Sequence, residues 1–140
     1  MRIAIINGPN LNLLGKRERE IYGDECMEDY LPVLRSRYSA HEISYSQANE
    51  EGVVINLLHE YALKVDGIVL NPGGFTHQSV SVADAVRAIK VPVVEVHVSQ
   101  LPGREHYRGR SLVAPACKGS ISGFGLTVYE LGVHALILDQ

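Results

Sequence analysis

The sequence predicts an α/β protein in which a five-stranded parallel sheet is covered by helices on both faces. Short apolar runs alternate with stretches of helical periodicity along the chain, which is typical of sheets built from successive β-α units. The 140 residues, 46% of them hydrophobic, are enough for one sizeable core. No linker, internal repeat or low-complexity tract divides them. We therefore expect a single domain spanning residues 1–140.

Five segments have the character of strands. The run RIAII near the start of the chain is uniformly apolar, which favours a buried strand, whereas HEISYSQ alternates between apolar and polar residues. The segment DGIVLN ends at the turn signal PGG, VPVVEVHV leads into a polar loop, and ACKGSIS is a short candidate for the last strand. The predicted strands are residues 2–6, 41–47, 66–71, 91–98 and 116–122.

Four longer segments predict helices. Residues 24–38 have an acidic first turn that suits the helix dipole, although Pro32 predicts a kink or a later start. In residues 49–64 and 78–89 the apolar side chains recur at helical spacing, and residues 125–138 close the chain as a fourth helix.

Right-handed crossovers between these units favour a doubly wound, flavodoxin-like sandwich. In such sheets ligands bind beyond the carboxyl ends of the strands. Three polar segments, 7–23, 71–79 and 95–108, meet at that edge in the predicted topology. The side chains that they supply there are Asn10, Asn12, Arg17, Tyr22, Asn71, His77, Glu95, His97, Ser99, Arg104 and Arg108.

Composition narrows the classes of function. The formal net charge of −3 and the pI near 6.0 give no indication of nucleic acid or an anionic membrane as a partner. No apolar run is long enough to span a bilayer, and we expect no signal peptide. Cys26 and Cys117 lie far apart and favour two reduced thiols in a cytoplasmic protein. No metal-binding spacing and no GxSxG nucleophile motif is present.

Tyr22 follows Arg17 in the first polar segment. A guanidinium about 4 Å from a phenol stabilises the phenolate by up to roughly 4 kcal/mol at an effective dielectric near 20. A tyrosine beside arginines can therefore act as a general base near neutral pH. The same residues also fit an exposed loop tyrosine among solvated charges, and the spacing leaves both interpretations open.

Glu95 and His97 are two residues apart on a predicted strand, so they point to the same face. A carboxylate beside an imidazole fixes its tautomer and makes it a usable general acid. A purely structural pair at the end of the strand is the alternative. In the segment NPGGFTHQS, the turn and the following helix start could bind an anion. The later GSISGFG favours a compact turn.

Several of these segments together resemble the type II dehydroquinases, the 3-dehydroquinate dehydratases. The resemblance runs from the first strand to the last helix and keeps the order and spacing of the motifs. They are INGPNLNLLGKRE followed by IYG, then QANEEG, NPGGFTHQSV, EVHVS and GREHYR. The resemblance implies a flavodoxin-like fold, trimers assembled into a dodecamer, and no metal or organic cofactor. It also implies the reversible dehydration of 3-dehydroquinate to 3-dehydroshikimate through an enolate. The resemblance further implies a step in shikimate synthesis or in quinate breakdown, and the sequence leaves both open.

The resemblance also implies roles for individual residues. Tyr22 falls on the base and Arg17 on the arginine that activates it, both in a mobile lid. Asn10 falls on the asparagine that holds a water near the enolate oxygen. His97 falls on the general acid, oriented by Glu95. The substrate contacts fall on Asn71, His77, Val98, Ser99 and Arg108, with Arg104 near the lid and Asp84 reaching a neighbouring subunit's site.

The sequence departs from the family pattern at Arg19, Gln100 and Arg110, where the family usually has proline, asparagine and often histidine. These departures keep open a related lyase acting on a different cyclic hydroxy-keto acid. A non-catalytic module that binds a small anion is a further alternative, because a fold alone does not determine function.

Overall fold

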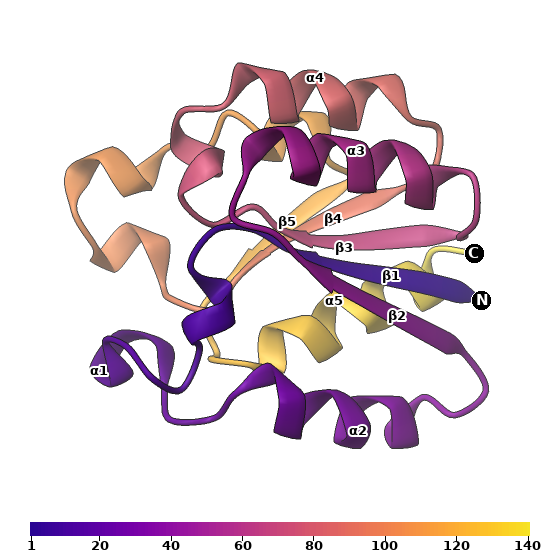
Figure 1. Cartoon of the computed structure of the whole chain (residues 1–140), viewed down its shortest axis with the longest axis horizontal. Helices are drawn as coiled ribbons and strands as arrows, with labels where there is room; N and C mark the ends of the chain where they lie inside the picture. The colour runs from indigo at the N-terminus through magenta and orange to yellow at the C-terminus, as the bar shows by residue number, and fades with distance from the viewer.

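A computed structural model describes residues 1–140 and confirms the predicted α/β fold (Figure 1). All four strand pairings are parallel, and the order across the sheet is β2-β1-β3-β4-β5, the flavodoxin-like order. The strands are β1 Arg2–Asn7, β2 Glu42–Gln47, β3 Gly67–Asn71, β4 Val93–His97 and β5 Gly119–Ser122.

Helices cover both faces of the sheet (Figure 1), with α3 and α4 on one face and α2 and α5 on the other. A buried cluster fills each interface, because the side chains of the central strands alternate between the two faces. The α-helices are α1 Arg19–Tyr22, α2 Met27–Arg37, α3 Glu51–Ala62, α4 Val80–Ala88 and α5 Thr127–Leu138. No helix is long and apolar enough to cross a membrane.

All four predicted helices begin two or three residues later than expected. Helix α2 begins at Met27 rather than at residue 24, and it continues through Pro32. Pro32 lies on the exposed face of the helix, so solvent can hydrate the carbonyl that it leaves without a partner. Helix α4 begins at Val80, where the Ser79 hydroxyl accepts a hydrogen bond from the backbone N–H of Val82.

Short helices that the sequence did not predict lie in the loops. Helix α1 occupies part of the first polar segment, and the last strand begins at Gly119, preceded by a 3-10 turn. The 3-10 helices are η1 Leu11–Leu13, η2 Gly73–His77, η3 Leu101–Gly103, η4 His106–Gly109 and η5 Ala114–Ala116.

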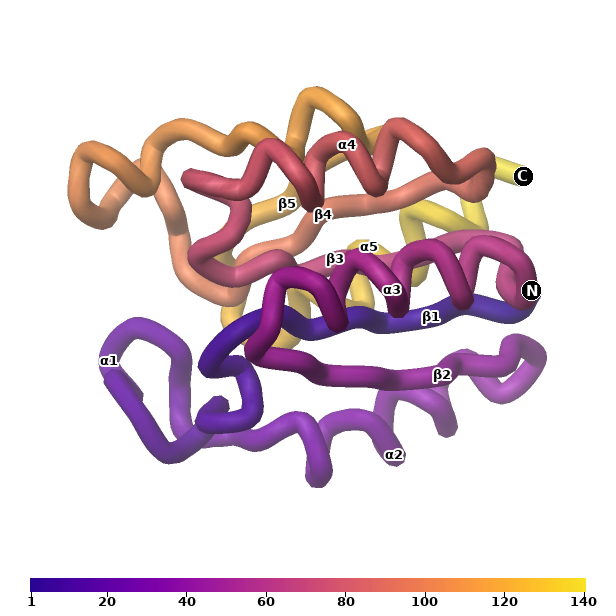
Figure 2. Tube along the Cα trace, turned by 45° about the horizontal axis from the view of Figure 1, so that its top comes forward, coloured from indigo at the N-terminus to yellow at the C-terminus, as the bar shows by residue number.

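The polar segments converge at the carboxyl ends of the strands, as the topology predicts. Figure 2 shows the loop with α1 and the loop that follows β4 projecting from the same end of the sheet. Asn7 and Asn71 are paired across β1 and β3 at this end. The next residue, Gly8, donates its N–H to the Asn71 carbonyl at 2.8 Å. A Cβ at Gly8 would lie 2.7 Å from the Pro72 carbonyl oxygen, so only glycine permits this close approach.

Candidate active site

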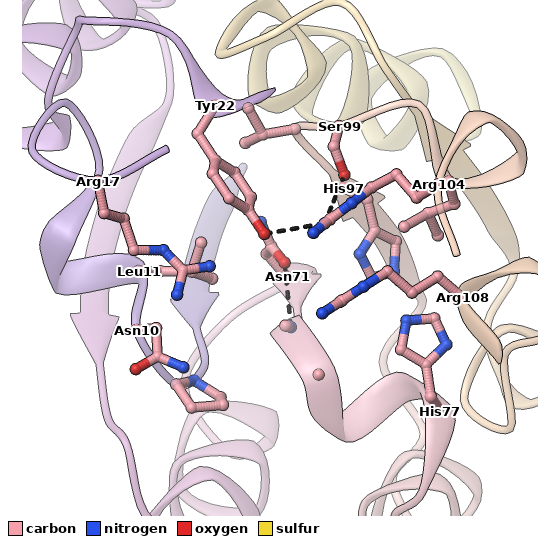
Figure 3. A pocket seen from close by; sticks show the side chains of 15 residues that line it. Asn10, Leu11, Arg17, Tyr22, Asn71, His77, His97, Ser99, Arg104 and Arg108 are labelled. Carbon is pink, nitrogen blue, oxygen red and sulfur yellow. Dashed lines mark hydrogen bonds between the residues drawn. The ribbon is translucent and has the colours of Figure 1, made fainter. Parts of the chain in front are cut away.

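A polar cavity of about 110 Å³ lies at the carboxyl edge of the sheet (Figure 3). Its walls come from the loops after β1, β3 and β4. Most of the site residues predicted from the sequence line it, together with residues that sequence reasoning did not select. The lining residues are Pro9, Asn10, Leu11, Arg17, Tyr22, Asn71, Gly73, Gly74, His77, His97, Val98, Ser99, Leu101, Arg104 and Arg108.

Tyr22 projects into the cavity from the end of α1 and is flanked by two arginines (Figure 3). Arg104 donates a hydrogen bond to the Tyr22 hydroxyl at 2.9 Å and a second one to the Ser99 hydroxyl at 3.3 Å. Arg17 instead lies against the ring, with its guanidinium carbon 4.7 Å from the ring centroid. The predicted arginine environment therefore contains two cations, and the one that contacts the oxygen is Arg104.

His97 ends β4 and is almost fully buried. Its Nε2 lies 2.6 Å from Oε1 of Glu95, which is completely buried. Nδ1, the other ring nitrogen, makes no hydrogen bond within the chain. Because the carboxylate occupies Nε2, this arrangement leaves Nδ1 as the nitrogen that can exchange a proton with a ligand in the cavity.

Glu95 lies behind His97, outside the cavity lining. Its carboxylate accepts hydrogen bonds from three hydroxyls, those of Thr76, Ser111 and Ser120. Burial raises the pKa of the Glu95 carboxyl, but the hydrogen bonds from His97, Thr76 and Ser111 outweigh burial and hold that pKa below its usual range. The carboxylate is therefore ionised at neutral pH and faces an imidazole.

Asn71 is held by the core beneath the cavity. Its amide nitrogen donates to the Tyr129 hydroxyl at 2.9 Å, and its amide oxygen accepts from the Gly73 backbone N–H at 3.1 Å. The Tyr129 hydroxyl in turn donates to the Asn7 side-chain oxygen at 2.7 Å. These bonds fix the Asn71 amide in one orientation where it meets the cavity.

The remaining polar side chains surround the opening. Asn10, an exposed residue with a left-handed backbone (φ 68°), lies on the same side as Arg17 in Figure 3. His77 and Arg108 lie on the other side. Nδ1 of His77 is 2.7 Å from the Arg110 carbonyl oxygen, which leaves Nε2 for a ligand. Ser99 is already bonded to Arg104.

Asp84 lies apart from the cavity that its own chain forms. It is on α4, its side chain is 68% exposed, and its carboxylate lies 3.4 Å from Arg87. No group of three or more histidine, cysteine, aspartate or glutamate side chains is arranged to hold a metal ion.

Sequence reasoning missed the groups that support the site from behind. Thr76, Ser111 and Tyr129 belong to no catalytic pattern, and their partners are 19, 16 and 58 residues away. A hint was available for Thr76 only, since it lies within the polar segment 71–79. The contacts of the other two depend on the fold.

These features define a class: flavodoxin-like proteins equipped for acid–base chemistry on a small anion at the carboxyl edge of the sheet. The phenol and the imidazole can exchange protons, and three guanidiniums can hold a negatively charged ligand. The chain belongs to the family described as Dehydroquinase class II, whose profile matches residues 1–137.

Known proteins support this assignment along the whole chain. A 3-dehydroquinate dehydratase of Clostridium acetobutylicum is 48% identical over 138 residues, covering 97% of this chain and 96% of the relative. The crystal structure of a type II dehydroquinase from Butyrivibrio crossotus has a TM-score of 0.94 at 38% identity and covers 98% of this chain and 97% of its own. A second type II dehydroquinase structure, from Propionibacterium acnes, has a TM-score of 0.93 at 34% identity, covering 99% and 97%.

Proposed function

We propose that this protein is a lyase that reversibly dehydrates 3-dehydroquinate to 3-dehydroshikimate, as the names of its relatives describe for them. The observation that carries the proposal is the presence in one cavity of the Tyr22 hydroxyl, bonded to Arg104, and of His97, backed by a buried carboxylate. A β-hydroxy ketone loses water when a base removes the α-proton and an acid protonates the departing hydroxyl.

Tyr22 is the base in this mechanism. As phenolate it takes the proton from the carbon next to the ketone, and the electrons of that C–H bond move into an enolate. Arg104 and Arg17 stabilise the phenolate because both guanidiniums lie within about 5.5 Å of the ring centroid. Asn10, at the edge of the cavity, holds a water that stabilises the enolate oxygen.

His97 is the acid. The enolate electrons form the carbon–carbon double bond as the carbon–oxygen bond to the leaving hydroxyl breaks, and His97 supplies the proton that makes this hydroxyl water. Glu95 orients the ring and stabilises its cationic form. The proton that Tyr22 accepted then returns to solvent while His97 takes one up, so the cycle releases one water and no net proton.

The other lining residues bind the substrate. Arg108 suits the carboxylate, and Asn71, His77 and Ser99 suit the hydroxyls, with Val98 beside them at the end of β4. Asp84 is exposed on α4, away from its own cavity, and we assign it to the site of a neighbouring subunit in trimers that assemble into a dodecamer.

The departures from the family pattern lie outside the cavity lining. Arg19 contacts Gly15 and Asp24, Gln100 contacts Ser122, and Arg110 contributes a backbone carbonyl to His77. No observation therefore favours a different cyclic hydroxy-keto acid as the substrate.

The test is a spectrophotometric assay of the purified protein with 3-dehydroquinate, because the conjugated product absorbs in the ultraviolet where the substrate barely does. We expect steady turnover that Tyr22→Phe lowers by at least about a hundredfold. Tyr38→Phe is the matched control and should leave turnover unchanged, because the Tyr38 hydroxyl contacts Glu130 of α5 and neither residue lines the cavity.

Circular dichroism would show that both variants fold. Near-normal turnover by Tyr22→Phe would reject Tyr22 as the base. No turnover by the folded wild type would reject the substrate. A panel of other cyclic hydroxy-keto acids would then separate the two alternatives. Turnover of one of them would indicate a related lyase, and turnover of none would indicate a non-catalytic binding module.

A further inference from the structure

Glu95 is an anion buried without a lysine or arginine partner. Its carboxylate is completely buried, and its one cationic partner is His97 when that ring is protonated. A buried carboxylate is very costly unless hydrogen bonds compensate for lost hydration. Here three neutral hydroxyls supply the compensation: Thr76 from η2, Ser111 from the loop before η5, and Ser120 from β5.

The hydrogen-bonding pattern fixes the direction of the protons. The Ser111 oxygen accepts the backbone N–H groups of Val113 at 3.1 Å and Ala114 at 2.8 Å, which use both of its lone pairs. Its own proton must therefore go to Glu95, at 3.1 Å, or to Thr76, at 2.6 Å. Thr76 contacts Glu95 Oε1 directly. In either arrangement the hydroxyl protons point toward the carboxylate.

One further titratable group lies beside Glu95, whereas several face His97 from the cavity. On the side of η5, Cys117 is the one titratable neighbour, and burial together with the Glu95 carboxylate raises its pKa to about 12, so it is neutral. On the cavity side His97 faces Tyr22, His77 and the guanidiniums of Arg17, Arg104 and Arg108. The hydroxyls are thus the groups that determine how much negative charge Glu95 presents to His97.

We propose that Thr76 and Ser111 are positioning residues for the acid of the reaction, and that they act by partly neutralising the Glu95 carboxylate. Ser120 makes the longest of the three contacts, 3.4 Å, and contributes least. The inference rests on the proposed role of His97 as the acid. It adds that the strength of this acid is determined one layer further back, by hydroxyls that touch neither the substrate nor the imidazole.

The sign of the effect follows from the charge on Glu95. If a hydroxyl is removed, the carboxylate becomes more basic and attracts the imidazolium proton more strongly. His97 then keeps its proton to higher pH and donates it less readily. Turnover should fall while substrate binding, which uses other groups, should not.

Thr76→Val tests this directly, because valine keeps the shape of threonine and removes the donor. We expect kcat to fall about tenfold, while KM stays within about twofold of the wild-type value. The alkaline limb of the profile of kcat against pH should move up by about one pH unit. Thr76→Ser, which keeps the hydroxyl, should restore both. Ser120→Ala should give a smaller shift in the same direction.

If Thr76→Val does not fold, Thr76→Ala compared with Thr76→Ser gives a pair that differs by the hydroxyl alone. If the folded variant without the hydroxyl keeps the alkaline limb of its kcat profile at the wild-type pH, the proposal is overturned. A merely structural role of Thr76 would alter stability but would not move this limb.

Nuclear magnetic resonance of the His97 ring nitrogens separates this proposal from the proposed function. The ring titration is measured without substrate, and we expect it to move to higher pH in Thr76→Val and not in Thr76→Ser. If the wild type does not act on 3-dehydroquinate, the proposed function fails while this titration still decides the role of the hydroxyls. An unmoved titration rejects the positioning role whatever the activity.

Discussion

The Glu95 carboxylate contributes both to the chemistry of the site and to the stability of the fold. Glu95 is ionised in the folded protein because donors surround it, and burial alone would favour its neutral form. The same donors make Glu95 contribute to folding, since the unfolded chain binds a proton at a higher pH than the folded protein does.

The sign of the resulting pH dependence follows from the lowered pKa. The contribution of Glu95 is fully present above the unfolded glutamate pKa of about 4.3, and it is lost as pH falls through the folded value. In Glu95→Gln, we expect the unfolding free energy to fall less steeply below about pH 4.3, by up to about 1.4 kcal/mol per pH unit. Urea unfolding at a series of pH values and one protein concentration measures this slope.

Glu60→Gln provides the control, because Glu60 is an exposed residue on α3 whose ion-pair partner is Lys64. Its slope should match the wild type. Equal slopes for Glu95→Gln and the wild type would show that Glu95 does not hold the charge that its hydrogen bonds imply.

At the scale of elements, helix α5 packs directly onto the sheet through a glycine. Gly132 is buried, and a Cβ placed there would lie 3.0 Å from a Val69 methyl and 3.1 Å from a Val96 methyl. Helix propensity favours alanine over glycine by about 1 kcal/mol. Overpacking a close-packed core costs about 1–3 kcal/mol, so the packing cost of an added Cβ exceeds the gain in helix propensity.

We therefore expect Gly132→Ala to lower the unfolding free energy by about 1 kcal/mol. The matched control is Gly52→Ala on α3, where no atom lies within 4 Å of the added Cβ. That variant should be more stable by about 0.5–1 kcal/mol. Urea unfolding measures both, and a stabilised Gly132→Ala would mean that α5 shifts freely on the sheet.

Most of the elements could be predicted from the sequence, and the exceptions have a physical cause. Strands such as β1 and β3 were found because their apolar runs are sufficient to specify a buried strand. Helix α1 has four residues, too few for a periodic signal, and tertiary contacts hold it in place.

The candidate site also divides into residues that the sequence indicates and contacts that only the fold creates. His97 could be selected because an ionisable group at the end of a buried strand is conspicuous. Tyr22 could be selected because it follows Arg17 in a polar segment. The Arg104 contact with the Tyr22 hydroxyl joins residues 82 positions apart, so no local pattern could have distinguished it from Arg17. The contacts of Thr76, Ser111 and Ser120 with Glu95 could not be predicted for the same reason, since these residues lie 19, 16 and 25 positions from it.

At the scale of the whole molecule, the role of Asp84 decides whether each active site is formed by one chain or by two. It is exposed on α4 and absent from its own cavity, whereas Tyr22 is inside that cavity. If subunits associate with cyclic symmetry and Asp84 serves the neighbouring site, each active site takes Tyr22 from one chain and Asp84 from the next.

Mixed assemblies test this sharing. Tyr22→Phe and Asp84→Ala should each be nearly inactive as pure proteins, because every site lacks one group. When the two variants are unfolded together in equal amounts and refolded, about one site in four pairs an intact Tyr22 with an intact Asp84 and should regain activity. The assay is turnover per chain, with light scattering to establish the mass of the assembly against the 15.4 kDa chain. Activity equal to the average of the two separately refolded variants would place Asp84 outside the neighbouring site, since sharing requires that the mixture exceed it.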